Sequence, residues 1–120
     1  MQVLSHHIYE YRKGIRRLVL HTMQSKCRQC AEQRLKDNDI FYWIQTVNEK
    51  TINVFFGDRE CVEVICSFGE KLLNQYTPEE DFILGVLLGY DTTKQCQRYM
   101  TMKDKGKADT NSFVKTCNLN

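Results

Sequence analysis

The stretch that most constrains the fold covers residues 40–68, which have the pattern of strand, turn, strand, tight turn and helix. Segments 40–47 and 51–56 are rich in aromatic and β-branched residues, and the three polar residues between them have the length of a hairpin loop. A glycine then stops the second strand, and Asp58 is a favourable N-cap for a segment with apolar residues at helical spacing. The stretch therefore predicts a β-hairpin followed directly by a helix.

The rest of the chain predicts one further strand and several helices. Residues 3–14 fit a short helix that ends at a glycine, although alternate residues there would also form one face of a strand. Thr77, Pro78 and Glu80 have the spacing of a capping box, with proline at the first helical position. We expect a strand over 18–21, helices over 3–14, 25–37, 58–69, 77–89 and 91–102, and one loose helical turn over 70–76.

This order predicts an α/β (α+β) domain with a three-stranded sheet and about five helices. A β-α-β-β-α core is followed by C-terminal helices, and the helix between the first strand and the hairpin is long enough for a parallel connection. Residues 1–102 are expected to form one domain, and residues 103–120 a polar, mobile tail. The helix over 77–89 is apolar nearly all round, so it should be buried, with Gly85 and Gly89 packed against the sheet.

The composition indicates a soluble cytosolic protein. Seventeen basic and fifteen acidic residues leave a net charge of +2, which by itself predicts neither a nucleic-acid nor a membrane partner. The longest uncharged apolar run, 82–90, is too short to cross a bilayer, and the first residues lack the pattern of a signal peptide. The six cysteines are then expected to be reduced thiols.

A cluster of four cations is the candidate partner-binding site. Arg12, Lys13, Arg16 and Arg17 lie within six residues, beside two tyrosines. Such a cluster can be a solvated surface, can dock an acidic protein, or can bind nucleic acid through phosphates and stacked bases. Of the two binding hypotheses, the acidic protein partner is the stronger.

Cys27 and Cys30 form the candidate redox motif. They follow a predicted strand and lie at the start of a helix, where the helix dipole lowers a thiol pKa. The alternative is a structural role, because both thiols share one helical stripe with Ala31 and Leu35 and would then face the core. A zinc site needs four ligands, and only His21 is available to join the pair, so no metal or cofactor is expected.

No group of residues indicates a catalytic site. His6 and His7, with Glu10 one turn on, would suit acid–base chemistry, but solvated histidines near a terminus explain them as well. The three carboxylates at 79–81 lie in the first turn of a helix, where the dipole favours them. The sequence therefore favours a protein without enzymatic activity.

Four blocks of sequence carry a resemblance to a known family, and they are residues 6–14, 18–22, 52–58 and 77–85. Together they resemble a bacterial family catalogued as domain of unknown function 2023, over about residues 2–102. The resemblance implies a few strands with about five helices, a homodimer, and genes that often neighbour a flavodoxin gene. It implies no catalytic residues, because none are established for the family.

A homodimer is also expected from the sheet itself. A three-stranded sheet leaves two edges open, and few helices are available to cover aromatic residues on both of its faces. These residues are Phe41, Tyr42, Trp43, Phe55 and Phe56. Together with the resemblance, this predicts an accessory or interaction protein linked to flavodoxin or electron-transfer metabolism. Small thiol-disulfide redox chemistry and weak nucleic-acid binding are the alternatives.

Overall fold

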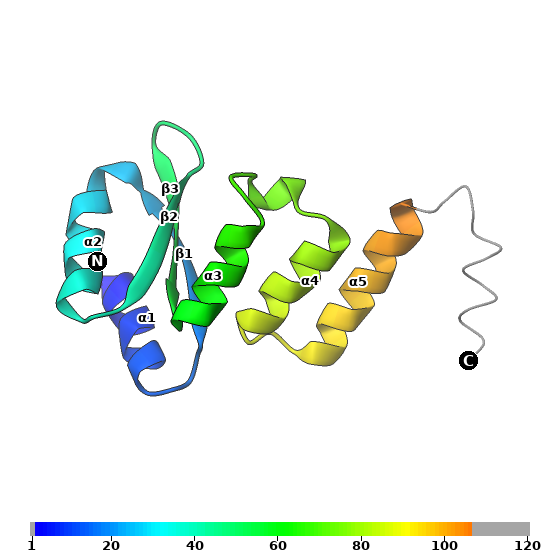
Figure 1. The fold of residues 1–120 in the computed structure, drawn as a ribbon, viewed down its shortest axis with the longest axis horizontal. Coiled ribbons are helices and arrows are strands. Elements are labelled where there is room, and N and C mark those ends of the chain that lie inside the picture. The colour runs from blue at the N-terminus through cyan, green and yellow to red at the C-terminus, as the bar shows by residue number, and fades with distance from the viewer. Residues whose placement is uncertain (1, 107–120) are drawn as a thin grey trace.

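The structure, a computed structural model, describes residues 2–106. Within them the chain forms five α-helices, three strands and two short 3₁₀ turns, shown in Figure 1. The helices are α1 (Gln2–Arg12), α2 (Arg28–Asp37), α3 (Arg59–Ser67), α4 (Pro78–Leu87) and α5 (Thr92–Gly106). The strands are β1 (Leu18–Gln24), β2 (Phe41–Thr46) and β3 (Thr51–Gly57), and the 3₁₀ turns are η1 (Ser25–Cys27) and η2 (Leu73–Gln75). The predicted fold class is confirmed.

The sheet is antiparallel, with β3 in the centre and β1 and β2 at the edges. Leu18 of β1 and Phe41 of β2 both pair with Gly57 at the end of β3. Because β1 and β2 are each antiparallel to β3, they run parallel to one another. The connection through α2 joins these two parallel strands, as its length led us to expect. The two strands are not neighbours, however, because β3 lies between them.

Helices cover both faces of the sheet (Figure 1). On one face, α1 and α2 bury Leu4 and Leu35 against Phe56. On the other, Val62 of α3 and Leu84 of α4 join Phe55 in a second apolar cluster. Phe55 and Phe56 are both 0% exposed. One chain thus shelters the centre of its own sheet, and the premise that a second copy is needed is wrong for Phe55 and Phe56, whereas Phe41 in an edge strand stays 38% exposed.

Helices α3, α4 and α5 follow one another in a row leading away from the sheet (Figure 1). Thr77 begins α4 with the predicted capping box, accepting a hydrogen bond from the Glu80 amide at 3.2 Å while the Glu80 carboxylate accepts one from the Thr77 amide at 2.9 Å. Asp91 caps α5, as predicted, by accepting a bond from the Lys94 amide at 2.9 Å. Helix α5 continues to Gly106, four residues beyond the predicted helix end at residue 102. The remainder of the predicted tail, 107–120, lies outside the described residues.

Two expectations about α4 are wrong. Its outer face is solvated, with Ile83 and Val86 exposed, because α5 packs on one side of this helix and Leu84 faces the cluster formed with α3 and the sheet on another. Gly85 does not accommodate the sheet. A Cβ atom at Gly85 would lie 2.0 Å from the Gln95 side-chain oxygen, so the glycine makes room for α5. Gly89, with a φ of 85°, ends the helix as predicted.

Candidate functional site

A cleft of about 670 Å³ lies at the end of the sheet where β3 finishes and β1 and β2 begin. Three segments converge there because Gly57 pairs with the first residue of both edge strands. They are the end of α1 with the loop to β1, the end of α2 with the loop to β2, and the turn into α3. The cleft is lined by Tyr11, Arg12, Gly14, Arg16, Arg17, Asp37, Asn38, Asp39, Ile40 and Asp58.

Gly57 allows two of these segments to meet. Its φ is 142°, and a Cβ atom there would lie 2.2 Å from the carbonyl oxygen of Arg17. That carbonyl accepts a hydrogen bond of 2.9 Å from the backbone amide of Asp58. A side chain at position 57 would force this bond apart, so the glycine is required by the close approach of the two backbones.

Asp58 lies at the N-cap position of α3, as predicted, but its side chain makes no capping hydrogen bond. Its carboxylate instead faces the cleft, where Oδ1 accepts a hydrogen bond from the Tyr11 hydroxyl at 2.9 Å and Oδ2 lies 3.4 Å from Arg17 Nη1. Burial, followed by the hydrogen bond to Asp58, raises the pKa of Tyr11. The sequence indicated only a helix cap here, because Tyr11 and Asp58 are far apart along the chain.

Three of the four predicted cations line the cleft, and each has a partner. Arg12 Nη1 donates to the Asn38 carbonyl at 3.0 Å, Arg16 Nε lies 3.5 Å from Glu10 Oε1, and Arg17 contacts Asp58. Lys13 lies outside the lining, with its Nζ 5.5 Å from the centre of the Tyr9 ring. Since Asp37 and Asp39 also line the cleft, it is a site of mixed charge rather than a purely basic patch.

The histidines are closer together than the sequence indicated. His6 is exposed, but His7 of α1 meets His21 of β1 with ring centroids 5.2 Å apart. Glu10 lies within 3.5 Å of His6 Nε2 and 3.7 Å of His7 Nδ1. The reading of both adjacent histidines as solvated is therefore wrong for His7, and His21 joined the group only through the packing of α1 on β1.

Cys27 lies in η1 and Cys30 in the first turn of α2, and neither forms a disulfide with another cysteine of residues 2–106. Ala31 and Leu35 are buried as the stripe predicted, but Cys30 is exposed and Cys27 only half-buried. The structural alternative is thus wrong for Cys30, whose thiol does not face the core. Within residues 2–106, no group of three or more histidine, cysteine or acidic side chains is placed to hold a metal ion.

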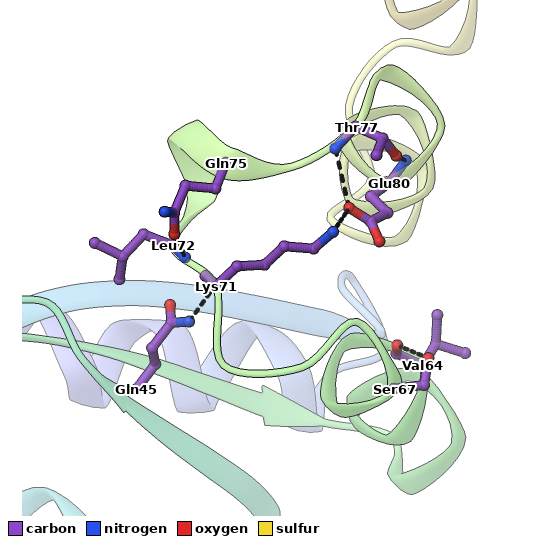
Figure 2. A network of polar contacts seen from close by, with 8 residues as sticks. All are labelled: Gln45, Val64, Ser67, Lys71, Leu72, Gln75, Thr77 and Glu80. Atoms are coloured by element: carbon purple, nitrogen blue, oxygen red, sulfur yellow. Dashed lines mark hydrogen bonds and ion pairs between the residues drawn. The ribbon is translucent and has the colours of Figure 1, made fainter.

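The α4 carboxylates have cationic partners as well as a favourable helix dipole. Figure 2 shows Lys71 reaching from the loop before η2 to Glu80, with Nζ 2.7 Å from Oε1. The same loop is fixed to the sheet by Gln45, whose amide donates to the Lys71 carbonyl at 2.6 Å (Figure 2). The hydrogen bond from Lys71 lowers the pKa of Glu80. These acidic residues therefore stabilise the helix and its connection, in agreement with their structural interpretation.

Comparisons with known proteins agree with the resemblance seen in the sequence. None of the helices in residues 2–106 is long and apolar enough to cross a membrane. No curated protein matches the chain. A family model described as protein of unknown function (DUF2023) matches residues 2–102, which is most of the chain, and the chain belongs to that family.

Proposed function

We propose that this chain is a cytosolic accessory protein that binds an acidic partner protein through the cleft, using Arg12, Arg16 and Arg17 with Lys13 at its margin. A flavodoxin is the partner that the family resemblance implies. The observation that carries the proposal is the cleft of about 670 Å³, whose lining includes Arg12, Arg16 and Arg17. Guanidinium groups bind carboxylates with two parallel hydrogen bonds, which suits an acidic loop that enters a cleft.

The existing contacts of the cleft arginines leave room for such a partner. The Arg17 side chain is 81% exposed, and its one ion pair spans 3.4 Å. An exposed pair of this kind contributes about 0–1 kcal/mol, so a partner carboxylate can replace or join Asp58 at little cost. The aspartates in the cleft select against a uniformly negative surface and favour a partner that presents a few carboxylates in a fixed arrangement.

Titration of labelled flavodoxin tests the proposal at about 20 mM salt, where screening is weak. Binding is expected to weaken as salt increases, and charge reversal by Arg12→Glu with Arg17→Glu should weaken it at least about tenfold. Both positions lie outside the two apolar clusters, so the fold should be unchanged. Lys94→Glu with Lys105→Glu, the same total charge change at two exposed positions of α5, is the matched control. Absence of binding at low salt, or an equal loss in the control, would contradict the proposal.

We also propose that the chain forms a homodimer. With the sheet covered, the support comes from apolar side chains that remain exposed on the outer helices, namely Ile83, Val86 and Met100. Ile83 and Met100 border an apolar groove of about 420 Å³ between α4 and α5. Sedimentation at micromolar concentration should report twice the chain mass. The Ile83→Glu variant should report a mass closer to that of a single chain. Val64→Glu on α3, at an equally exposed apolar residue, is the control, and a monomer at all concentrations would overturn the proposal.

Thiol-disulfide chemistry is a second candidate, favoured by the exposure of Cys30 in the first turn of α2. A measured thiol pKa near neutrality at Cys27, with loss of function in Cys27→Ser at unchanged melting temperature, would support it. Nucleic-acid binding stays the weakest alternative, because Asp37, Asp39 and Asp58 would repel phosphates from the same cleft. Its signature is an affinity for nucleic acid that falls steeply with salt.

A further inference from the structure

We propose that Glu10 is a proton-controlled switch, shared between His7 and Arg16, that sets how much positive charge the cleft presents. The inference rests on the proposed function for its consequence, since it concerns regulation of the same cleft. The contacts on which it stands lie beside the cleft rather than in it. Only Arg16 belongs to both sites.

One oxygen of Glu10 has two candidate partners. Oε1 lies 3.7 Å from His7 Nδ1 and 3.5 Å from Arg16 Nε, whereas Oε2 lies 3.5 Å from His6 Nε2. His7 Nδ1 is buried and makes no hydrogen bond in the described part of the chain. A neutral His7 ring can leave this atom as a bare acceptor facing a carboxylate, which gives no attraction, so Arg16 holds Glu10.

Protonation of His7 changes the balance. Nδ1 becomes a cationic donor aimed at Oε1, and a charge-assisted hydrogen bond of this kind is about twice as strong as a neutral one. The ring is only one-fifth exposed, so solvent screens this contact less than it screens the more exposed Arg16 pair. Glu10 is then drawn to His7, and the Arg16 guanidinium is released toward the cleft that it lines.

The neighbours of His7 on each packed element favour one proton, not two. His21 of β1 faces it at 5.2 Å between ring centroids. Burial, then the nearness of His7, lowers the pKa of His21. From α1 itself, His6 and Glu10 face His7, and Arg16 comes from the loop to β1. The α2 cation that contacts α1, Arg34, bonds Ser5, roughly 160° around the helix from His7.

These contacts determine the direction in which the affinity of the cleft changes with pH. Histidine side chains gain their proton as pH falls through about 6.5. Burial lowers the pKa of His21, so the switch concerns the protonation of the facing ring, His7, next to the Glu10 carboxylate. Arg16 is therefore held by Glu10 above neutrality and released in mild acid. Affinity of the cleft for an acidic partner should rise as pH falls from about 8 to about 5.5.

A first experiment needs no partner. The Arg16 Nε–Hε resonance of the full chain is followed by NMR from about pH 8 to about pH 5.5, together with the histidine rings. It should move with the His7 titration, stay constant in His7→Gln, and still move in His6→Gln, the matched control. A constant Arg16 signal in the natural chain, or an unchanged response in His7→Gln, would overturn the switch.

A second experiment measures binding of an oligo-aspartate peptide, whose carboxylates stay ionised at about pH 5.5 because their ordinary pKa is about 3.9. Affinity should rise about two- to fivefold between about pH 8 and pH 5.5, the equivalent of one released ion pair. His7→Gln should abolish the rise, and Glu10→Ala should bind at the higher affinity throughout. If no variant binds while Arg16 still responds to His7, the proposed function fails and the switch stands. If the peptide binds and its affinity depends on pH equally in the natural chain and in His7→Gln, the switch fails.

Discussion

The sheet and the α4–α5 hairpin are held together by different forces. Phe55, Phe56, Leu4 and Leu35 are all 0% exposed, and helices pack on both faces of the strands that carry the aromatics. In α5 no residue is buried. Apolar burial stabilises by about 25 cal/mol per Å², whereas exposed ion pairs contribute about 0–1 kcal/mol each.

Polar contacts dominate where α5 meets α4. Arg98 binds Asp81 through two hydrogen bonds of 2.7 and 3.0 Å, and Lys103 Nζ lies 2.9 Å from Glu79. The Tyr99 ring adds an edge contact with Phe82 at 5.6 Å between centroids. Stability is therefore uneven along the chain, and α5 should open long before the sheet does.

The largest expected effect is in the sheet. Phe56→Ala should lower the free energy of unfolding by about 3–5 kcal/mol, because it leaves a cavity between α1, α2 and the sheet. Tyr99→Ala in α5 removes an aromatic ring of similar size at a partly solvated site. It should lower the free energy of unfolding by less than half as much. Denaturant unfolding of the two variants measures the contrast. Equal losses would mean that α5 is part of the main cooperative core.

The next effect concerns the backbone at the cleft. Gly57→Ala should destabilise the fold by about 2–3 kcal/mol, because position 57 has a φ of 142° and its Cβ would meet the Arg17 carbonyl at 2.2 Å. Gly14→Ala is the matched control, since its φ of 79° is also positive but no atom lies within 4 Å of the added carbon. It should cost about 1–2 kcal/mol. Thermal unfolding distinguishes the two, and a smaller loss at position 57 would refute the steric argument.

A smaller, local loss of stability is expected where α5 packs on α4. Arg98→Gln removes the paired hydrogen bonds to Asp81 and should reduce the stability of α5 by about 1 kcal/mol or less. Hydrogen exchange should quicken in α5 and stay unchanged in β3, whose residues from Ile52 to Phe56 are buried. Lys94→Gln serves as the control for loss of one charge on the same helix. Faster exchange in β3 would show that the two regions open together.

The smallest effect is the acid sensitivity of a second contact between α4 and α5, the ion pair of Glu79 with Lys103. The hydrogen bond from Lys103 lowers the pKa of Glu79 to about 2. A carboxyl whose pKa is lowered by folding contributes stability above its ordinary pKa of 4.5, and this is lost as pH falls toward about 2. The helical signal of α5 should therefore weaken over that range, and Glu79→Gln should flatten the dependence. An identical acid profile in Glu79→Gln would contradict the role of this pair.

Much of the fold could be predicted because the signals are local. The hairpin loop, the Thr77–Glu80 capping box and the Asp91 cap each act over a few residues, and all are present. Burial of α4 was predicted wrongly from its composition. An apolar helix is buried only if enough neighbours surround it, and here α5 and the cluster formed with α3 and the sheet leave Ile83 and Val86 exposed.

The sequence alone determined which segments form helices and strands and where the main caps lie, and it placed the arginines in one short stretch. Tertiary structure decided what those arginines meet. Tyr11 and Asp58 are 47 positions apart, and they bond only because β3 ends beside the start of β1. His21 reaches His7 because α1 packs on β1. Contacts of this range depend on strand register and helix packing, which the free energy of the whole core selects, whereas caps and turns depend on neighbours along the chain.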